Sequence, residues 1–215
     1  MQELTKIKFC GLMSKADIKL AIKANVNMIG FVFFGPSPRS LTIDKASQLM
    51  ENIPNNILKI ALTVNADDAL LSQIARHTTV DLFQLHGSED PERLIQIKER
   101  YKLGTIKVIP ISNSSDLKNI SDFDHISDYI MFDAKPPLGT SRPGGNAISF
   151  DWQLLKDIQC DAPWILAGGL TSRNVKKAIK VSGAKMVDVS SGVERSPGVK
   201  DPNRINAFVK SIKEL

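Results

Sequence analysis

The stretch Met28-Ile29-Gly30-Phe31-Val32-Phe33-Phe34 is apolar throughout and carries no charged side chain. A strand with one face in water alternates apolar and polar residues, whereas a parallel strand covered by helices on both faces is apolar along its whole length. The run therefore predicts a central strand of a parallel sheet. Strand-like and helix-like segments alternate on both sides of it, from one end of the chain to the other.

This alternation predicts eight strands and eight helices. The predicted strands cover residues 4–9, 28–34, 58–64, 80–85, 105–111, 129–132, 164–167 and 186–189. The predicted helices cover residues 14–24, 44–51, 66–76, 91–100, 115–120, 151–158, 172–181 and 202–213.

The number of units favours a closed barrel. Eight βα units in 215 residues leave about 27 residues for each unit, and eight units favour a (β/α)8 TIM barrel. An open, doubly wound sheet needs a glycine-rich nucleotide loop after its first strand, and Cys10-Gly11-Leu12-Met13-Ser14 is not one. We expect an α/β protein with a single barrel domain over residues 1–215.

Composition limits the classes of function. Hydrophobic residues make up 42% of the chain, and 28 basic against 23 acidic residues give a net charge of +5 without a basic block. We therefore expect no nucleic-acid partner and no membrane span, with anionic small molecules as the natural ligands. The two cysteines, Cys10 and Cys160, fit neither a disulfide framework nor a metal site, and no signal peptide is visible. These features favour a cytoplasmic location.

Catalytic groups of a barrel lie at the carboxyl ends of its strands. Cys10 should end the first strand, and Lys8 lies on the same strand face, where its charge favours a thiolate. Asp133 follows another apolar run. Burial disfavours the charged form of a carboxyl group, which suits a general acid. The alternatives are a buried structural cysteine and a salt bridge from Asp133 to Lys135.

Two loops near the end of the chain suggest a phosphate site. Gly168-Gly169 follows the seventh predicted strand, and Ser190-Ser191-Gly192 follows the eighth. Glycine lacks a Cβ, so its backbone N–H groups approach an anion closely. The loops after these two strands are the usual phosphate position in a TIM barrel. Ordinary turns are the alternative explanation.

Two further residues at the same rim are candidates for binding. Arg39 lies in a proline-rich loop and can hold a carboxylate through two parallel hydrogen bonds, although a solvated arginine is the simpler reading. His86 follows the fourth strand and is open to roles as a ligand, an acid–base group or a structural residue. No spacing of His, Cys and Asp indicates a metal site, so we expect none. Cys160 should be a structural residue at the opposite rim.

A series of motifs resembles the phosphoribosylanthranilate isomerase family. The motifs are Lys8-Phe9-Cys10-Gly11, Gly30-Phe31-Val32-Phe33, Ser37-Pro38-Arg39-Ser40, Val80-Asp81-Leu82-Phe83-Gln84-Leu85-His86-Gly87, Phe132-Asp133-Ala134-Lys135, Phe150-Asp151-Trp152, Leu166-Ala167-Gly168-Gly169-Leu170, Val187-Asp188-Val189-Ser190-Ser191-Gly192-Val193-Glu194 and Pro197-Gly198-Val199-Lys200-Asp201. They cover essentially the whole chain.

The resemblance implies a single-domain barrel of tryptophan biosynthesis that needs no cofactor. Such an isomerase converts N-(5-phosphoribosyl)anthranilate into 1-(2-carboxyphenylamino)-1-deoxyribulose 5-phosphate by an Amadori rearrangement. The resemblance makes Asp133 the general acid, which opens the sugar ring to a Schiff base. It makes Cys10 the general base, which removes the C2 proton.

The resemblance also implies a binding site for a small phosphosugar. Arg39 would bind the anthranilate carboxylate, and Asp188 would contact the ribose. The remaining expected substrate-binding residues are His86, Gly169, Ser191 and Gly192, the last three through a phosphate. Both a monomer and a homodimer fit the sequence.

One loop departs from the family pattern. Arg142-Pro143-Gly144-Gly145-Asn146-Ala147 precedes Phe150-Asp151-Trp152, and Ala147 replaces the last glycine of the family's loop. We expect the loop to cover the substrate.

Other phosphate-binding barrels are alternatives. Indole-3-glycerol-phosphate synthase would need a catalytic lysine–glutamate set, and the histidine-pathway sugar isomerase would need paired aspartates with two-fold internal similarity. The first strand here ends in Cys10 rather than an aspartate. A phosphosugar-binding protein without catalysis is a third alternative, against which the presence of Cys10 and Asp133 argues.

Overall fold

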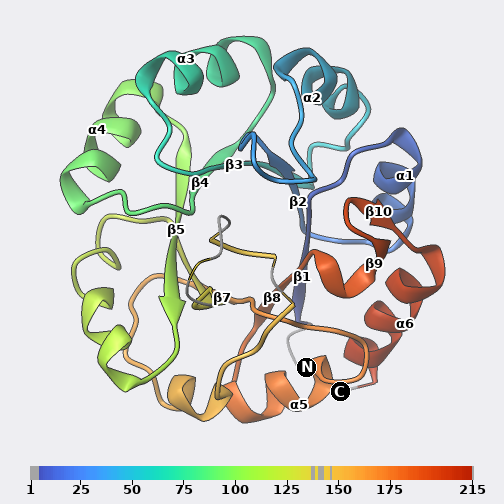
Figure 1. Ribbon diagram of the computed structural model, residues 1–215, viewed down its shortest axis with the longest axis vertical. Coiled ribbons are helices and arrows are strands. Elements are labelled where there is room, and N and C mark those ends of the chain that lie inside the picture. Colours follow the sequence, from blue (N-terminus) through green and yellow to red (C-terminus); the bar gives the residue numbers. More distant parts are fainter. Residues whose placement is uncertain (1–4, 137–138, 140–142, 146, 215) are drawn as a thin grey trace.

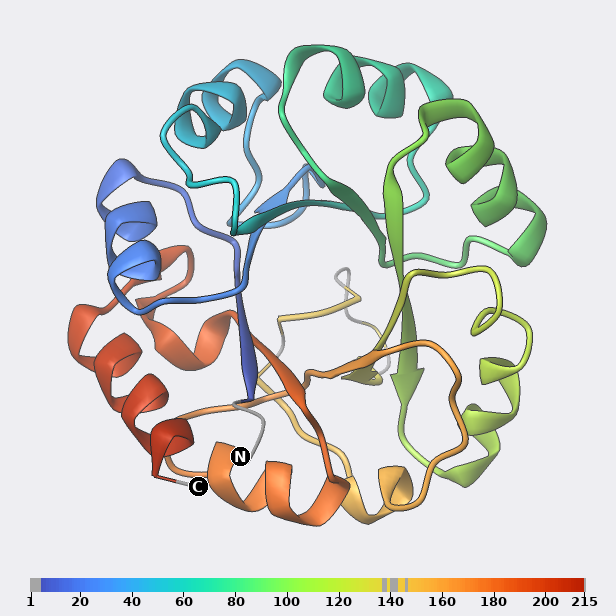
Figure 2. The ribbon, with the colours of Figure 1, turned by 180° about the vertical axis from the view of Figure 1, so that it is seen from behind.

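Eight parallel strands close into a barrel in chain order, with β8 returning to pair with β1 (Figure 1). The structure is a computed structural model and describes residues 5–136, 139, 143–145 and 147–214. The helices form a ring around the barrel, as the view from behind also shows (Figure 2). The predicted (β/α)8 barrel is confirmed.

The elements follow the predicted order. The barrel strands are β1 (Lys6–Cys10), β2 (Met28–Val32), β3 (Leu58–Thr63), β4 (Leu82–Leu85), β5 (Gly104–Ile111), β6 (Tyr129–Ala134), β7 (Trp164–Leu166) and β8 (Met186–Val189). The α-helices are α1 (Lys15–Lys23), α2 (Ile43–Met50), α3 (Asp68–His77), α4 (Pro91–Tyr101), α5 (Val175–Ser182) and α6 (Pro202–Lys213). No helix among the described residues is long and apolar enough to cross a membrane.

Side-chain caps explain where several helices begin. The Ser14 hydroxyl accepts a hydrogen bond from Asp17 N at 3.1 Å, and the Asp17 carboxylate accepts one from Ser14 N at 3.1 Å, which forms a capping box before α1. Asp90 and Asp201 cap α4 and α6, each followed by a proline in the first turn. The bounds of β8 and α6 are those predicted from the sequence.

Two of the predicted α-helices are wrong. The segments after β5 and β6 form short 3₁₀ helices instead, η1 (Ser114–Ile120) and η2 (Trp152–Leu155). Before η1, the Asp116 carboxylate accepts from Ser112 N at 2.8 Å, and such local bonds compete with an α-helix. After η2, Asp157 has a φ of 61°, a left-handed conformation that a right-handed helix cannot include.

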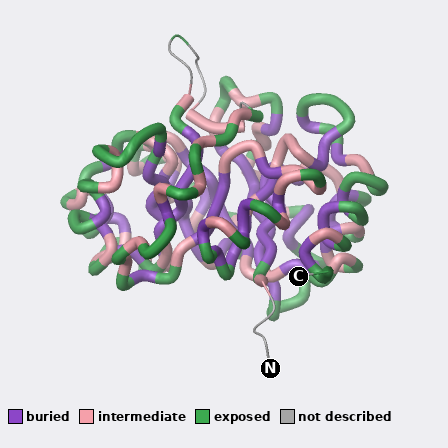
Figure 3. The backbone as a smooth tube through the Cα atoms, turned by 90° about the horizontal axis from the view of Figure 1, so that it is seen from below, coloured by how far each residue is buried: buried purple, intermediate pink, exposed green. Residues whose placement is uncertain are grey.

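The strands present alternate side chains to the helices and to the barrel interior. Phe9 and Phe132 pack edge-to-face against Phe208 and Trp164 in the outer layer. Their neighbours on β1 and β6 therefore point inward. The interior holds an apolar cluster of Met28, Ile60, Leu82, Ile106, Val108, Met131, Ile165, Ala167 and Met186. Buried backbone runs through the centre and exposed segments lie around it (Figure 3).

A small hairpin follows β8 and was not predicted. A 3₁₀ turn, η3 (Ser191–Val193), leads into β9 (Glu194–Ser196), which pairs antiparallel with β10 (Val199–Lys200). Pro197 and Gly198 form the turn, and the φ of 81° at Gly198 explains the glycine. A Cβ there would lie 2.9 Å from the Pro38 carbonyl, so the turn packs closely against the loop after β2.

Candidate active site

Two small cavities lie side by side at the carboxyl ends of the strands. Their volumes are about 60 and 40 Å³. The first is lined by Cys10, Arg39, His86, Asp133 and Asp188, and the second by Asp133, Gly169, Asp188, Ser191 and Gly192. The structure thus brings all of the predicted site residues together. Asp133 and Asp188 line both cavities and join them into one site.

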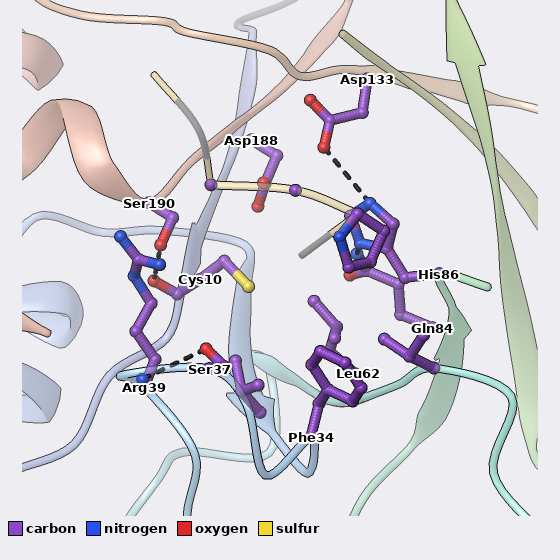
Figure 4. A pocket seen from close by; sticks show the side chains of 15 residues that line it. Cys10, Phe34, Ser37, Arg39, Leu62, Gln84, His86, Asp133, Asp188 and Ser190 are labelled. Atoms are coloured by element: carbon purple, nitrogen blue, oxygen red, sulfur yellow. Dashed lines mark hydrogen bonds and ion pairs between the residues drawn. The ribbon is translucent and has the colours of Figure 1, made fainter. Parts of the chain in front are cut away.

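Cys10 reaches the first cavity from the end of β1. Its sulfur points into the cavity (Figure 4), and only 4% of the residue is exposed. Gly30 lies opposite Cys10 in the β1–β2 register, and a Cβ on Gly30 would come within 2.8 Å of the sulfur. A glycine inside a strand often marks such a close approach. Gly30 therefore makes room for the thiol.

Lys8 and Asp188 form a buried ion pair below Cys10. The Lys8 ammonium donates to Asp188 Oδ1 at 2.7 Å across the β1–β8 pairing, and Lys8 is 1% exposed. Burial works against the charged form of Lys8, but Asp188 and Cys10 outweigh it and raise the pKa of Lys8 above its ordinary value. The positive charge of Lys8, which favours a Cys10 thiolate, is thus partly neutralised by Asp188.

The surroundings of Cys10 favour its protonated thiol over the thiolate. Burial raises the pKa of the thiol above its ordinary value of 9.0, Lys8 opposes this shift, and Asp188 adds to it. Lys200 and Arg39 act in the same direction as Lys8. The expectation that Lys8 favours the thiolate has the right sign, but burial is the larger effect.

Asp133 is held by two contacts at the end of β6. Its Oδ1 accepts a hydrogen bond from Ala134 N at 2.8 Å, and its Oδ2 lies 3.4 Å from His86 Nε2. His86 Nδ1 in turn lies 3.4 Å from Gln84 Nε2. The Gln84 side-chain oxygen is buried and has no partner among the described residues. His86 therefore connects the carboxyl group to the barrel interior (Figure 4).

Arg39 is fixed by a carboxylate from another part of the chain. Its Nε and Nη2 each donate to Glu194 at 2.8 Å, and Lys200 Nζ donates to the same carboxylate at 2.8 Å. Burial alone would raise the pKa of Glu194, but the bonds from Arg39 and Lys200 hold it below its ordinary value. Sequence reasoning missed Glu194 and Lys200 as site residues. The Pro197-Gly198 pair was the available signal, since a hairpin turn places residues on either side of it opposite each other.

The second cavity is suited to an anion. The backbone N–H groups of Gly169, Ser191 and Gly192 have no acceptor within the described part of the chain. Backbone donors without partners are ready to bind a phosphate. A Cβ on Gly192 would lie 1.8 Å from the Leu170 carbonyl, so only glycine lets the loops after β7 and β8 meet.

The segment before η2 lies across the mouth of the site. A Cβ on Gly144 would be 2.6 Å from His86, and one on Gly145 would be 2.8 Å from Arg39 Nη1. Ala147, which replaces the last glycine of the family's loop, has a φ of 57°. This left-handed conformation favours glycine. Arg142 and Asn146 of the predicted loop lie outside the described residues.

The raised pKa of Cys10 predicts slow alkylation by iodoacetamide at pH 7. A raised pKa leaves less thiolate at any given pH, so the rate should be at least about tenfold below that of glutathione and should rise with pH beyond 9. Peptide mass mapping separates Cys10 from Cys160, whose pKa burial raises to about 11. A Cys10 rate that levels off below pH 8 would contradict the prediction.

Known proteins agree with this geometry. Residues 7–211 match the family described as N-(5'phosphoribosyl)anthranilate (PRA) isomerase. The N-(5'-phosphoribosyl)anthranilate isomerases of Rhodospirillum rubrum and Paramagnetospirillum magneticum are 47% and 44% identical, over 98% and 97% of both chains. The crystal structure of phosphoribosyl anthranilate isomerase from Thermotoga maritima has a TM-score of 0.88 at 30% identity and covers 99% of this chain and 100% of its own. The chain therefore belongs to the N-(5'-phosphoribosyl)anthranilate isomerase family.

Proposed function

We propose that this chain converts N-(5-phosphoribosyl)anthranilate into 1-(2-carboxyphenylamino)-1-deoxyribulose 5-phosphate, with Asp133 as general acid and Cys10 as general base. The observation that carries the assignment is that these two groups face one cavity from the ends of β6 and β1. A related structure, 28% identical with a TM-score of 0.84 and covering 99% of this chain, is a complex with reduced 1-(o-carboxyphenylamino)-1-deoxyribulose 5-phosphate.

The reaction requires one proton delivered and one removed. Asp133 protonates the ring oxygen, the bond from C1 to that oxygen breaks, and the nitrogen lone pair forms the C1–N double bond of a Schiff base. The Cys10 thiolate then removes the C2 proton. The C2–H electrons form a C1–C2 double bond, and the former C1–N π electrons return to nitrogen. The resulting enolamine tautomerises to the ketone. Two groups of opposite protonation state perform such steps, and no cofactor is invoked.

The cations around Cys10 support its role as a base. Lys8, Lys200 and Arg39 each favour the thiolate, whereas burial opposes it. The fraction of Cys10 present as thiolate, and with it the rate of proton removal, should therefore increase with pH. We infer that burial keeps water away from the base. The positive charges of Lys8, Lys200 and Arg39 stabilise the thiolate when it forms during turnover.

The two ends of the substrate fit the two cavities. Arg39 Nη1 makes no hydrogen bond within the described residues and is the group that we assign to the anthranilate carboxylate. The N–H groups of Gly169, Ser191 and Gly192 are assigned to the phosphate. Remote binding at both ends holds the reacting carbons between acid and base.

Asp188 and His86 are assigned supporting roles. Asp188 lines both cavities and keeps one oxygen, Oδ2, outside the Lys8 pair, which suits a ribose hydroxyl. His86 lies 3.4 Å from the Asp133 carboxyl and orients it. Both cysteines are free thiols, which supports the proposed cytoplasmic location.

Complementation tests the reaction as a whole. Expression in a tryptophan auxotroph that lacks this isomerase should restore growth. Cys10→Ala and Asp133→Ala should each abolish growth and lower kcat by about 100-fold or more, because each removes one proton-transfer group. Calorimetry with the reduced product analogue should show that both variants still bind. Near-full turnover by either variant would refute its assigned role.

Gly30→Ala tests the placement of the base without touching its chemistry. The new Cβ would lie 2.8 Å from the Cys10 sulfur and must displace it. A shift of about 1 Å should lower kcat by about 100-fold. Gly35→Ala is the control, since nothing lies within 4 Å of its Cβ. Equal kcat values for the two variants would contradict the prediction.

Arg39→Ala should act mainly on binding. It removes the group assigned to the substrate carboxylate, so KM should rise by about tenfold or more. Steady-state kinetics over a range of substrate concentrations measures this. An unchanged KM would count against the carboxylate assignment.

A further inference from the structure

Glu194 neutralises the charge of Arg39 before any substrate binds. Glu194 accepts two hydrogen bonds from the guanidinium, at 2.8 Å each, and the side chains of Arg39 and Glu194 are 6% and 3% exposed. A bidentate pair of this kind is fully neutralised locally. Arg39 thus offers donors to a carboxylate, but the Arg39–Glu194 pair offers it no net positive charge.

Lys200 adds a second cation to the same buried cluster. Its Nζ lies 2.8 Å from Glu194 Oε1, 3.0 Å from the Ser190 carbonyl and 3.4 Å from the Ser190 hydroxyl. That hydroxyl donates its own proton to the Cys10 carbonyl at 3.0 Å, so it must accept from Lys200. Three acceptors require three donor protons, which only the ammonium form has. Burial lowers the pKa of Lys200 and Glu194 opposes this shift, and the three acceptors around Nζ favour the ammonium form.

The cluster of Arg39, Glu194 and Lys200 holds two positive groups and one negative group. The Lys200 side chain is 1% exposed, so water screens its charge poorly. Arg204 also reaches this segment, but it donates to the Glu194 carbonyl from an exposed position and leaves the carboxylate to the other two. A carboxylate arriving at Arg39 would balance the cluster.

We propose that Lys200 supplies the net positive charge of the carboxylate subsite and so determines the preference for a carboxylated aromatic amine. The inference rests on the proposed role of Arg39 and deepens it. Lys200 lines neither cavity and acts through the cluster, so it is a specificity-determining residue and not a catalytic one. The β9–β10 hairpin places Lys200 opposite Glu194.

Paired ligands test the proposal. Calorimetry at pH 7 would compare reduced 1-(o-carboxyphenylamino)-1-deoxyribulose 5-phosphate with the same compound lacking the carboxyl group. The unmodified protein should prefer the carboxylated ligand. Lys200→Met should reduce this preference by about tenfold or more and leave the affinity for the other ligand within about threefold. Lys200→Gln keeps donors for Glu194 and Ser190 without the charge, and it should give the same loss.

Lys107→Met is the matched control. Lys107 also pairs with a buried glutamate, Glu89, at 2.9 Å, with side chains 5% and 3% exposed, but it lines neither cavity of the site. This variant should keep the full preference. Circular dichroism would verify that each variant is folded.

The outcomes separate the two proposals. An unchanged preference in Lys200→Gln, or an equal loss of affinity for both ligands in both Lys200 variants, would overturn the role of Lys200. If Arg39→Met meanwhile abolishes the preference, the role of Arg39 stands alone. If the unmodified protein binds the two ligands equally, both assignments fall.

Discussion

The buried ion pair between Lys8 and Asp188 is the contact on which the site depends. It spans the seam where β8 closes against β1, with 2.7 Å between Lys8 Nζ and Asp188 Oδ1. Removing two charges from water is costly, so we infer that the pair acts on the register of β1 and β8 more than on net stability. A slip of either strand by one residue would turn its own side chain of the pair out of the barrel. The same register places Cys10 beside Ser190, whose hydroxyl donates to the Cys10 carbonyl.

Electrostatics at the site follow from this arrangement. Lys8 is paired with Asp188, whereas Arg39 and Lys200 share the one carboxylate of Glu194, and burial outweighs these charges and raises the pKa of Cys10. The carboxyl group of Asp133 lies on the other side of the cavity with His86 (Figure 4). The barrel thus places the proposed base, Cys10, and the proposed acid, Asp133, at the ends of two strands that are far apart in sequence.

Much of this could be predicted from the sequence because local signals were strong. The apolar run at 28–34 and the capping box at Ser14 specify a parallel strand and a helix start, and strand ends select Cys10 and Asp133. The 3₁₀ helices after β5 and β6 could not be predicted, because polar side chains there bond to the backbone in short turns. Glu194 and Lys200 could not be predicted as site residues because their role depends on Arg39, which approaches them only in the folded barrel.

The sequence separation of the buried ion pairs has a consequence for synthesis of the chain. Lys8 and Asp188 are 180 positions apart, and Arg39 and Glu194 are 155 positions apart. Both cations are made early on the ribosome, whereas both carboxylates emerge near the end. A nascent chain that stops before β8 leaves two cations without partners in the positions they occupy in the barrel, so closure must be a late, cooperative event. The polypeptide can acquire its catalytic centre only after nearly all of it has been translated.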